Sequence, residues 1–195
     1  IVGIYPILHD NTSYFIAADF DGENWLSDSK AFIFTCQNYG IDVYLERSRS
    51  GNGGHAWIVF ETPYPCIKSR LVVWEFIRQS LRLSEFDKEV TFDRLFPNQD
   101  VLPKAGFGNL IALPFQGKSI MHGNTVFIDL QNGAPFPDQW KFLKDVKKHT
   151  VAELDAVYYK LFDRISKVPE TTCQQDSRSN IIYITVNNKL LLRRS

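Results

Sequence analysis

Two aspartates separated by one residue, Asp19 and Asp21, stand at the end of the apolar and aromatic run SYFIAADF, residues 13–20. This composition predicts a buried strand, in which residues i and i+2 point to the same face. Both carboxylates would then lie side by side, where their mutual repulsion favours a divalent cation, as phosphoryl transfer requires. Carboxylates that lead into a turn, here at Gly22, are also common solvent-exposed caps, so the pair alone leaves both interpretations open.

A glycine-rich turn, ERSRSGNGGH at residues 46–55, is the second chemical signal. Glycines let backbone N–H groups approach an anion, and arginine, serine and histidine donate to phosphate oxygens. The residues in question are Arg49, Ser50, Gly51, Gly53 and His55. The segment lacks the Lys-Ser/Thr ending of a Walker A loop. It therefore predicts either a phosphate site of another kind or an ordinary hairpin connection with His55 as a strand residue.

A third carboxylate, Asp93, follows an apolar residue in TFDRLFPNQD, and the segment GNLIALPFQ follows at residues 108–116. Asp93 could complete a metal site of three aspartates, and Asn109 or Gln116 could hydrogen-bond a substrate. Taken alone, Asp93 and Arg94 are equally consistent with a surface ion pair.

The elements that must position these residues follow from hydrophobic periodicity and turn signals. Residues 13–47 predict a β-α-β unit, and a turn at 48–54 connects its second strand to a strand at 55–60 as a hairpin. Pro65 opens a helix to about residue 80, and Thr150 and Glu153 form a capping box for a helix to about residue 167. The expected fold class is α/β.

Length and composition indicate one folded domain, alone or with a small appendage. The chain has 195 residues, of which 44% are hydrophobic and 23% charged, so disorder is excluded. We expect a catalytic domain at 1–168, then a polar linker and a C-terminal hairpin at 169–195 that begins a following module. The N-terminus enters apolar sequence directly, which indicates a fragment of a longer polypeptide.

Charge, cysteines and hydropathy restrict the setting. Lys+Arg and Asp+Glu are both 22, so nucleic-acid binding would need a local basic patch. Three cysteines without a C-x-x-C pair argue against a disulfide framework or a zinc site, and for a reducing, cytoplasmic location. No apolar run approaches the ~18 to 20 residues of a membrane span.

In this order, the three signals resemble the archaeo-eukaryotic primase superfamily, and most closely the primase-polymerase domain of TOTE conflict systems. The strings that carry the resemblance are YPIL, AADFDGENW, ERSRSGNGGHAWIVF, FDRLFPNQD and GFGNLIALPFQ, within residues 5–116, and it continues more loosely to about residue 143. The resemblance implies a primase-polymerase core with a mixed sheet like that of an RNA-recognition motif, flanked by helices.

The resemblance also implies roles for the residues. Asp19, Asp21 and Asp93 would hold two Mg²⁺ or Mn²⁺ ions about 3.5 to 4 Å apart, with Asp129 in VFID as the alternative third ligand. Arg49, Ser50 and His55 would bind the phosphates of the nucleotide, with the glycines Gly51 and Gly53 giving backbone access. Two features depart from the family pattern: Ser50 lies five positions before His55, and Asn109 stands where relatives often have a basic residue. Triphosphate affinity would then depend more on Arg47, Arg49 or Lys104.

The implied activity is nucleotidyl transfer from an NTP or dNTP to a template-paired 3′-hydroxyl, with primer initiation as a further step. The implied partners are nucleoside triphosphates, a DNA or RNA template-primer, and helicase and nuclease modules of the same polypeptide, without a membrane. Two other functions stay open: a non-catalytic nucleic-acid-binding module, and a metal-dependent nuclease that uses the same carboxylates.

Overall fold

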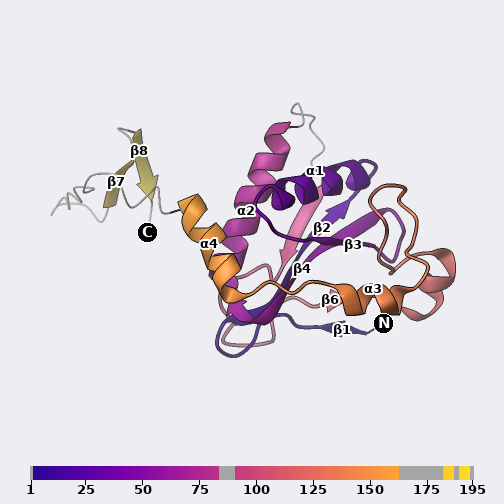
Figure 1. Ribbon diagram of the computed structural model, residues 1–195. Helices are drawn as coiled ribbons and strands as arrows, with labels where there is room; N and C mark the ends of the chain where they lie inside the picture. The colour runs from indigo at the N-terminus through magenta and orange to yellow at the C-terminus, as the bar shows by residue number, and fades with distance from the viewer. Residues whose placement is uncertain (1, 84–90, 163–181, 187–188, 194–195) are drawn as a thin grey trace. The chain divides into compact units, whose positions relative to one another are not determined.

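The computed structural model describes residues 2–83, 91–162, 182–186 and 189–193, and the chain divides into two compact units, Ile1–Tyr158 and Tyr159–Ser195 (Figure 1). Its elements are β1 Gly3–Ile4, β2 Thr12–Asp21, α1 Trp25–Gln37, β3 Tyr44–Arg47, β4 Gly53–Pro65, α2 Cys66–Leu83, β5 Phe92–Phe96, β6 Ile111–Ala112, the 3₁₀ helix η1 Gly117–His122, α3 Gln139–Asp145, α4 Val151–Phe162, β7 Ile182–Val186 and β8 Lys189–Arg193.

A four-stranded sheet in the order β3-β4-β2-β5 forms the centre of the first unit. All three neighbouring pairs are antiparallel. Along the chain the elements run β2-α1-β3-β4-α2-β5, which is the β-α-β-β-α-β order of the split β-α-β folds, to which RNA-recognition motifs belong. The predicted α/β class, with a sheet flanked by helices, is confirmed.

The β-α-β unit predicted at residues 13–47 forms as β2, α1 and β3, but its two strands are not neighbours. The next strand, β4, turns back from β3 as the predicted hairpin and inserts between β3 and β2. This insertion makes β4 antiparallel to both of its neighbours. It also brings the start of β4, with His55, against the end of β2, with Asp19.

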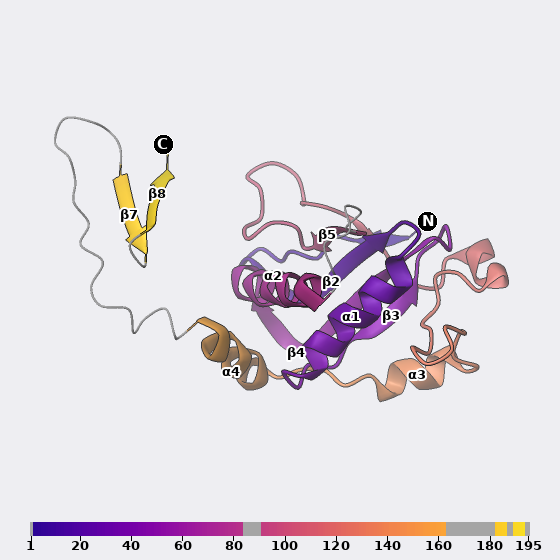
Figure 2. The same cartoon turned by 90° about the horizontal axis from the view of Figure 1, so that it is seen from above.

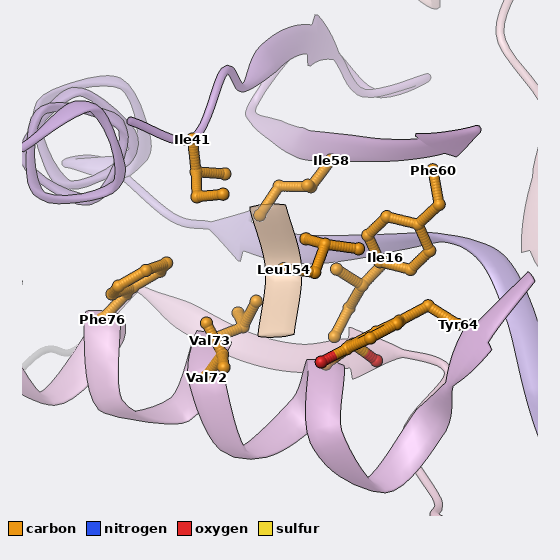
Figure 3. A pocket seen from close by; sticks show the side chains of 10 residues that line it. Ile16, Ile41, Ile58, Phe60, Tyr64, Val72, Val73, Phe76 and Leu154 are labelled. Carbon is orange, nitrogen blue, oxygen red and sulfur yellow. The ribbon is translucent and has the colours of Figure 1, made fainter. Parts of the chain in front are cut away.

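Helices α1 and α2 cover one face of the sheet, as Figure 2 shows from above. The core on this side contains alternate residues of the strands, such as Ile16 and Ile58, packed against Val73 and Phe76 of α2 (Figure 3). Leu154 of α4 closes the same cluster. The gap left among these side chains is about 10 Å³, room for no more than one water molecule, so this layer is closely packed.

The other face of the sheet is covered over part of its length by β1, β6 and α3 (Figure 1). Phe15, Trp57 and Phe96 of the sheet form an apolar cluster there with Ile111 of β6 and with Phe127. Because side chains alternate along a strand, Asp19 and His55 belong to this same face, further along β2 and β4. The acidic end of β2 therefore lies beyond the apolar cluster.

The C-terminal part of the described chain agrees with two predictions. Thr150 Oγ1 accepts a hydrogen bond from Glu153 N, and Glu153 Oε2 accepts one from Thr150 N, so the capping box is present at the start of α4. Strands β7 and β8 pair as an antiparallel hairpin. The predicted helix end at 163–167 and the predicted polar linker that follows residue 168 lie outside the described residues. Among the described helices, none has the length and hydropathy to cross a membrane.

Candidate active site

The carboxylates of Asp19, Asp21 and Asp93 form an acidic cluster at one end of the sheet. One oxygen from each lies within 4.8 Å of the others. Asp19 is half-buried, whereas Asp21 and Asp93 are exposed. Asp19 and Asp21 share a face of β2, the strand between β4 and β5, as the D-x-D spacing predicted. Asp93 comes from the neighbouring strand β5.

A β-bulge turns Asp93 toward the pair. In the register of β2 and β5, Asp19 lies opposite Arg94 but Phe20 lies opposite Phe92, so Asp93 is an extra residue with no partner of its own. Without the bulge, alternation would place Asp93 opposite Phe20, on the helix-covered face. The bulge lets Phe92 stay packed on Phe20, with ring centroids 5.9 Å apart, while Asp93 joins the acidic face.

The alternative third ligand, Asp129, lies elsewhere. Phe127 bridges to Glu46 of β3, which places this segment beside the edge strand opposite β5. Asp129 Oδ1 accepts a hydrogen bond from Gln131 N, as a turn-capping carboxylate does. The structure therefore brings Asp93, and not Asp129, to Asp19 and Asp21.

Gly53 makes room for Asp21, its direct neighbour across β2 and β4. A Cβ atom at position 53 would lie 2.6 Å from the carbonyl oxygen of Phe20, and closer still to Asp21 Oδ1. At Gly54 a Cβ would lie 2.8 Å from the carbonyl oxygen of Glu46. Neither position can hold a side chain unless the strands move apart, so the two glycines fix how closely β4 approaches the acidic cluster.

His55 lies directly opposite Asp19, with its Nε2 atom 3.6 Å from Asp19 Oδ1. Its other ring nitrogen, Nδ1, is 3.0 Å from Glu46 Oε2. Burial lowers the pKa of His55, but the hydrogen bond and charge of Glu46 and the charge of Asp19 outweigh burial, so the pKa of His55 is raised. A histidine that faces the acidic cluster is therefore biased toward its cationic form.

Asp19 is a weaker acid than an ordinary aspartate. Burial raises the pKa of its carboxyl, the charge of His55 lowers it, and the charges of Asp21 and Asp93 raise it, which gives a pKa of about 6. Repulsion among the three carboxylates is thus a cost of the fold that a bound cation would relieve. Arg94 offsets part of this charge: its Nε donates to Asp93 Oδ2 at 2.6 Å.

The loop between β3 and β4 borders the cluster. Its Asn52 carbonyl accepts from the N–H of Gly22, the residue after Asp21. Arg49 and Ser50 are exposed in this loop, and Gly51 has a φ of 84°, which a side chain would strain. Ser50 Oγ accepts from Asn52 N, so the serine shapes the turn in this structure.

Asn109 lies in irregular chain two residues before β6, which pairs with β1. Within the described ranges, no hydrogen bond or ion pair is found between Asn109 and the acidic cluster, so its contact with a substrate stays a prediction. Sequence reasoning missed Glu46, which is buried and contacts His55 directly. The hairpin register could have found it, because Glu46 of β3 lies directly opposite His55 of β4.

An apolar pocket of about 390 Å³ lies further along the same sheet face. Aromatic side chains contribute much of its wall: Tyr14, Phe15, Tyr44, Trp57, Phe115 and Trp140. Trp57 lies two residues after His55 on β4, and the two rings meet edge to face with centroids 6.2 Å apart. The charged and apolar parts of this face are therefore contiguous.

This face of the antiparallel sheet thus carries an acidic cluster next to a histidine and a glycine-rich turn. The model of one family, the archaeo-eukaryotic primase domain of TOTE conflict systems, matches residues 1–157. The chain belongs to this family, whose members are associated with primase-polymerase-like nucleotidyl transfer, and the resemblance seen in the sequence is confirmed. No curated protein gives a significant match.

Proposed function

We propose that this chain is the catalytic core of a template-dependent primase-polymerase that adds a nucleotide from an NTP or dNTP to a primer 3′-hydroxyl. The observation that carries the proposal is the meeting of Asp19, Asp21 and Asp93 beside His55 on one face of the sheet. Phosphoryl transfer needs concentrated negative charge to hold cations and a cationic donor for the triphosphate. The acidic cluster would hold the cations, and His55 would be the donor to the triphosphate.

The residues fit the metals that this chemistry uses. Carboxylate oxygens are the donors that Mg²⁺ and Mn²⁺ prefer, and the three oxygens lie close enough to share an ion. We assign Asp19, Asp21 and Asp93 as the ligands of two ions. When bound, the ions would activate the 3′-hydroxyl and neutralise the triphosphate and the leaving pyrophosphate.

The β3–β4 loop would hold the triphosphate. Arg49 is exposed in this loop and would contribute charge, while Ser50 and the backbone at Gly51 and Gly53 would contribute neutral donors. His55 would donate from Nε2 to a phosphate oxygen, which is a binding role and requires no proton abstraction. Asn109 is assigned to the substrate only on the family resemblance.

The wider assignment follows from the family. We propose that the catalytic domain comprises residues 1–168, that residues 169–195 begin a following module, and that helicase and nuclease modules lie in the same polypeptide. A template-primer of DNA or RNA would be the second substrate. Cys36 and Cys66 are buried free thiols, which supports a reducing, cytoplasmic location.

Primer extension tests the proposal. The chain is incubated with a labelled primer-template, nucleotides, and Mg²⁺ or Mn²⁺. We expect elongation by the wild type, none by Asp21→Asn or Asp93→Asn, and unchanged elongation by the control Asp129→Asn. The proposal is wrong if folded, nucleotide-binding protein does not extend the primer.

The same assay distinguishes the two other functions. Shortening of the primer in the absence of nucleotides would indicate a nuclease. Equal template binding by the wild type and Asp19→Ala, with activity in neither, would indicate a binding module.

A further inference from the structure

Glu46 is a buried carboxylate that contacts none of the three aspartates in the acidic cluster. Its side chain is 1% exposed, and its Oε2 atom accepts two hydrogen bonds. One comes from Trp57 Nε1 at 2.9 Å, and the other joins His55 Nδ1 at 3.0 Å. Burying a carboxylate is costly unless it is hydrogen-bonded, so these two N–H groups account for its presence in the interior.

The sheet register fixes this arrangement. Glu46 of β3 lies opposite His55 of β4, and His55 lies opposite Asp19 of β2, so the three side chains form a row across the sheet. Trp57 follows His55 by two residues and shares its face. Its indole and the imidazole of His55 therefore bond the same carboxylate oxygen, Oε2.

The contact determines what His55 can present to a substrate. An ionised carboxylate only accepts, so Nδ1 must carry the hydrogen in its bond to Glu46. The ring is then held with Nε2 directed toward the acidic cluster, 3.6 Å from Asp19 Oδ1. A carboxylate behind a histidine is a general way to fix both ring orientation and hydrogen placement.

We propose that Glu46, locked by Trp57, is a positioning residue that orients His55 so that Nε2 meets the triphosphate of the incoming nucleotide. This inference rests on the proposed function for the identity of the ligand. The hydrogen placement on His55, in contrast, is a property of the protein alone. Glu46 acts through His55 and does not touch the substrate.

Glu46→Gln is the first test, because it keeps the size of the side chain but removes its charge, so the His55 Nδ1–H group loses its ionised acceptor. We expect the KM for the nucleotide to rise about tenfold, the typical scale for losing such a supporting partner, with a smaller change in kcat. The affinity for a non-hydrolysable nucleotide, measured by calorimetry, should fall by the same factor. The matched control is Glu61→Gln, an exposed carboxylate on the neighbouring strand β4, which should change neither value.

Two measurements separate positioning from a merely structural role. In ¹⁵N-histidine NMR, the Nδ1 resonance of His55 should report a hydrogen-bonded hydrogen in the wild type, and it should shift in Glu46→Gln because the acceptor is no longer charged. In a double-mutant cycle, Glu46→Gln should add little to the KM of His55→Ala, because its effect passes through that ring. Trp57→Phe keeps an aromatic ring but removes the indole donor, and it should raise the KM by less than Glu46→Gln does.

Wild-type nucleotide affinity and an unchanged Nδ1 resonance of His55 in folded Glu46→Gln would overturn the inference, as would full additivity with His55→Ala. If Glu46→Gln does not fold, Trp57→Phe takes its place. The inference is overturned if Trp57→Phe changes neither the nucleotide affinity nor the ¹⁵N spectrum of His55. Failure of the proposed function would look different. The wild type would then not extend primers, while the NMR experiment would still report whether Glu46 fixes His55.

Discussion

Gly53→Ala should disable the site by adding a single methyl group. The new Cβ would lie 2.6 Å from the carbonyl oxygen of Phe20, whereas ordinary contact begins at 3.4 Å, so β2 and β4 must separate locally by about 0.8 Å. The side chain of Asp21, which lies closer still, must also leave its place. A misplacement of about 1 Å in a catalytic group can lower the rate about 100-fold. Overpacking should lower the free energy of unfolding by about 1 to 3 kcal/mol.

Three assays measure these effects. Primer extension per folded molecule gives the rate, calorimetry gives the affinity for Mn²⁺, and urea unfolding gives the free energy of unfolding. Gly40→Ala is the matched control. Gly40 has a φ of 75° and nothing within 4 Å of an added Cβ, so the substitution costs about 1 to 2 kcal/mol of backbone strain far from the acidic cluster. We expect a similar loss of stability but unchanged activity and Mn²⁺ affinity. If Gly53→Ala keeps the wild-type rate and Mn²⁺ affinity, the reasoning about this strand contact is refuted.

Three further predictions concern pH and packing. Because the pKa of Asp19 is about 6, protons should compete with cations for this carboxylate below pH 6. Calorimetry should therefore show that the affinity for Mn²⁺ falls about tenfold between pH 7 and pH 5. An affinity that does not change with pH would contradict this prediction. Burial lowers the pKa of His149, so the unfolded state binds a proton that the folded state does not, and stability should fall as pH drops through about 6.5. Between pH 7.5 and pH 5.5 the free energy of unfolding, measured in urea, should fall more for the wild type than for His149→Gln. Equal decreases would refute the contribution of His149 to the pH dependence. Leu154→Ala should lower the free energy of unfolding by about 2 to 4 kcal/mol, since Leu154 is buried between the sheet and α2. A decrease under about 1 kcal/mol would show that the packing of α4 contributes little to stability.

Local pattern was sufficient to predict the parts of the site that one strand supplies. Asp19 and Asp21 share a face because side chains alternate along β2, and the position of His55 near the start of a strand followed from the glycine-rich turn before it. The hairpin of β3 and β4 and the helix after Pro65 were also predicted from local signals. These features depend on neighbours in sequence, so no knowledge of tertiary pairing was needed.

The rest depends on pairing between distant strands. No local signal says that β4 inserts between β3 and β2, and this insertion is what places His55 opposite Asp19 and Glu46 opposite His55. The bulge in β5 is likewise a property of its pairing with β2, so Asp93 was selected on motif order and not on geometry. Gly53 was expected to give a phosphate access to the backbone, and the structure adds that it makes room for Asp21.

A crystal soaked with Mn²⁺ and a non-hydrolysable nucleoside triphosphate would test the central claim most directly. Anomalous scattering should show ions bound by Asp19, Asp21 and Asp93, with the triphosphate within hydrogen-bonding distance of His55 Nε2. Ions bound at Asp129 or elsewhere, or a triphosphate held away from His55, would contradict the account.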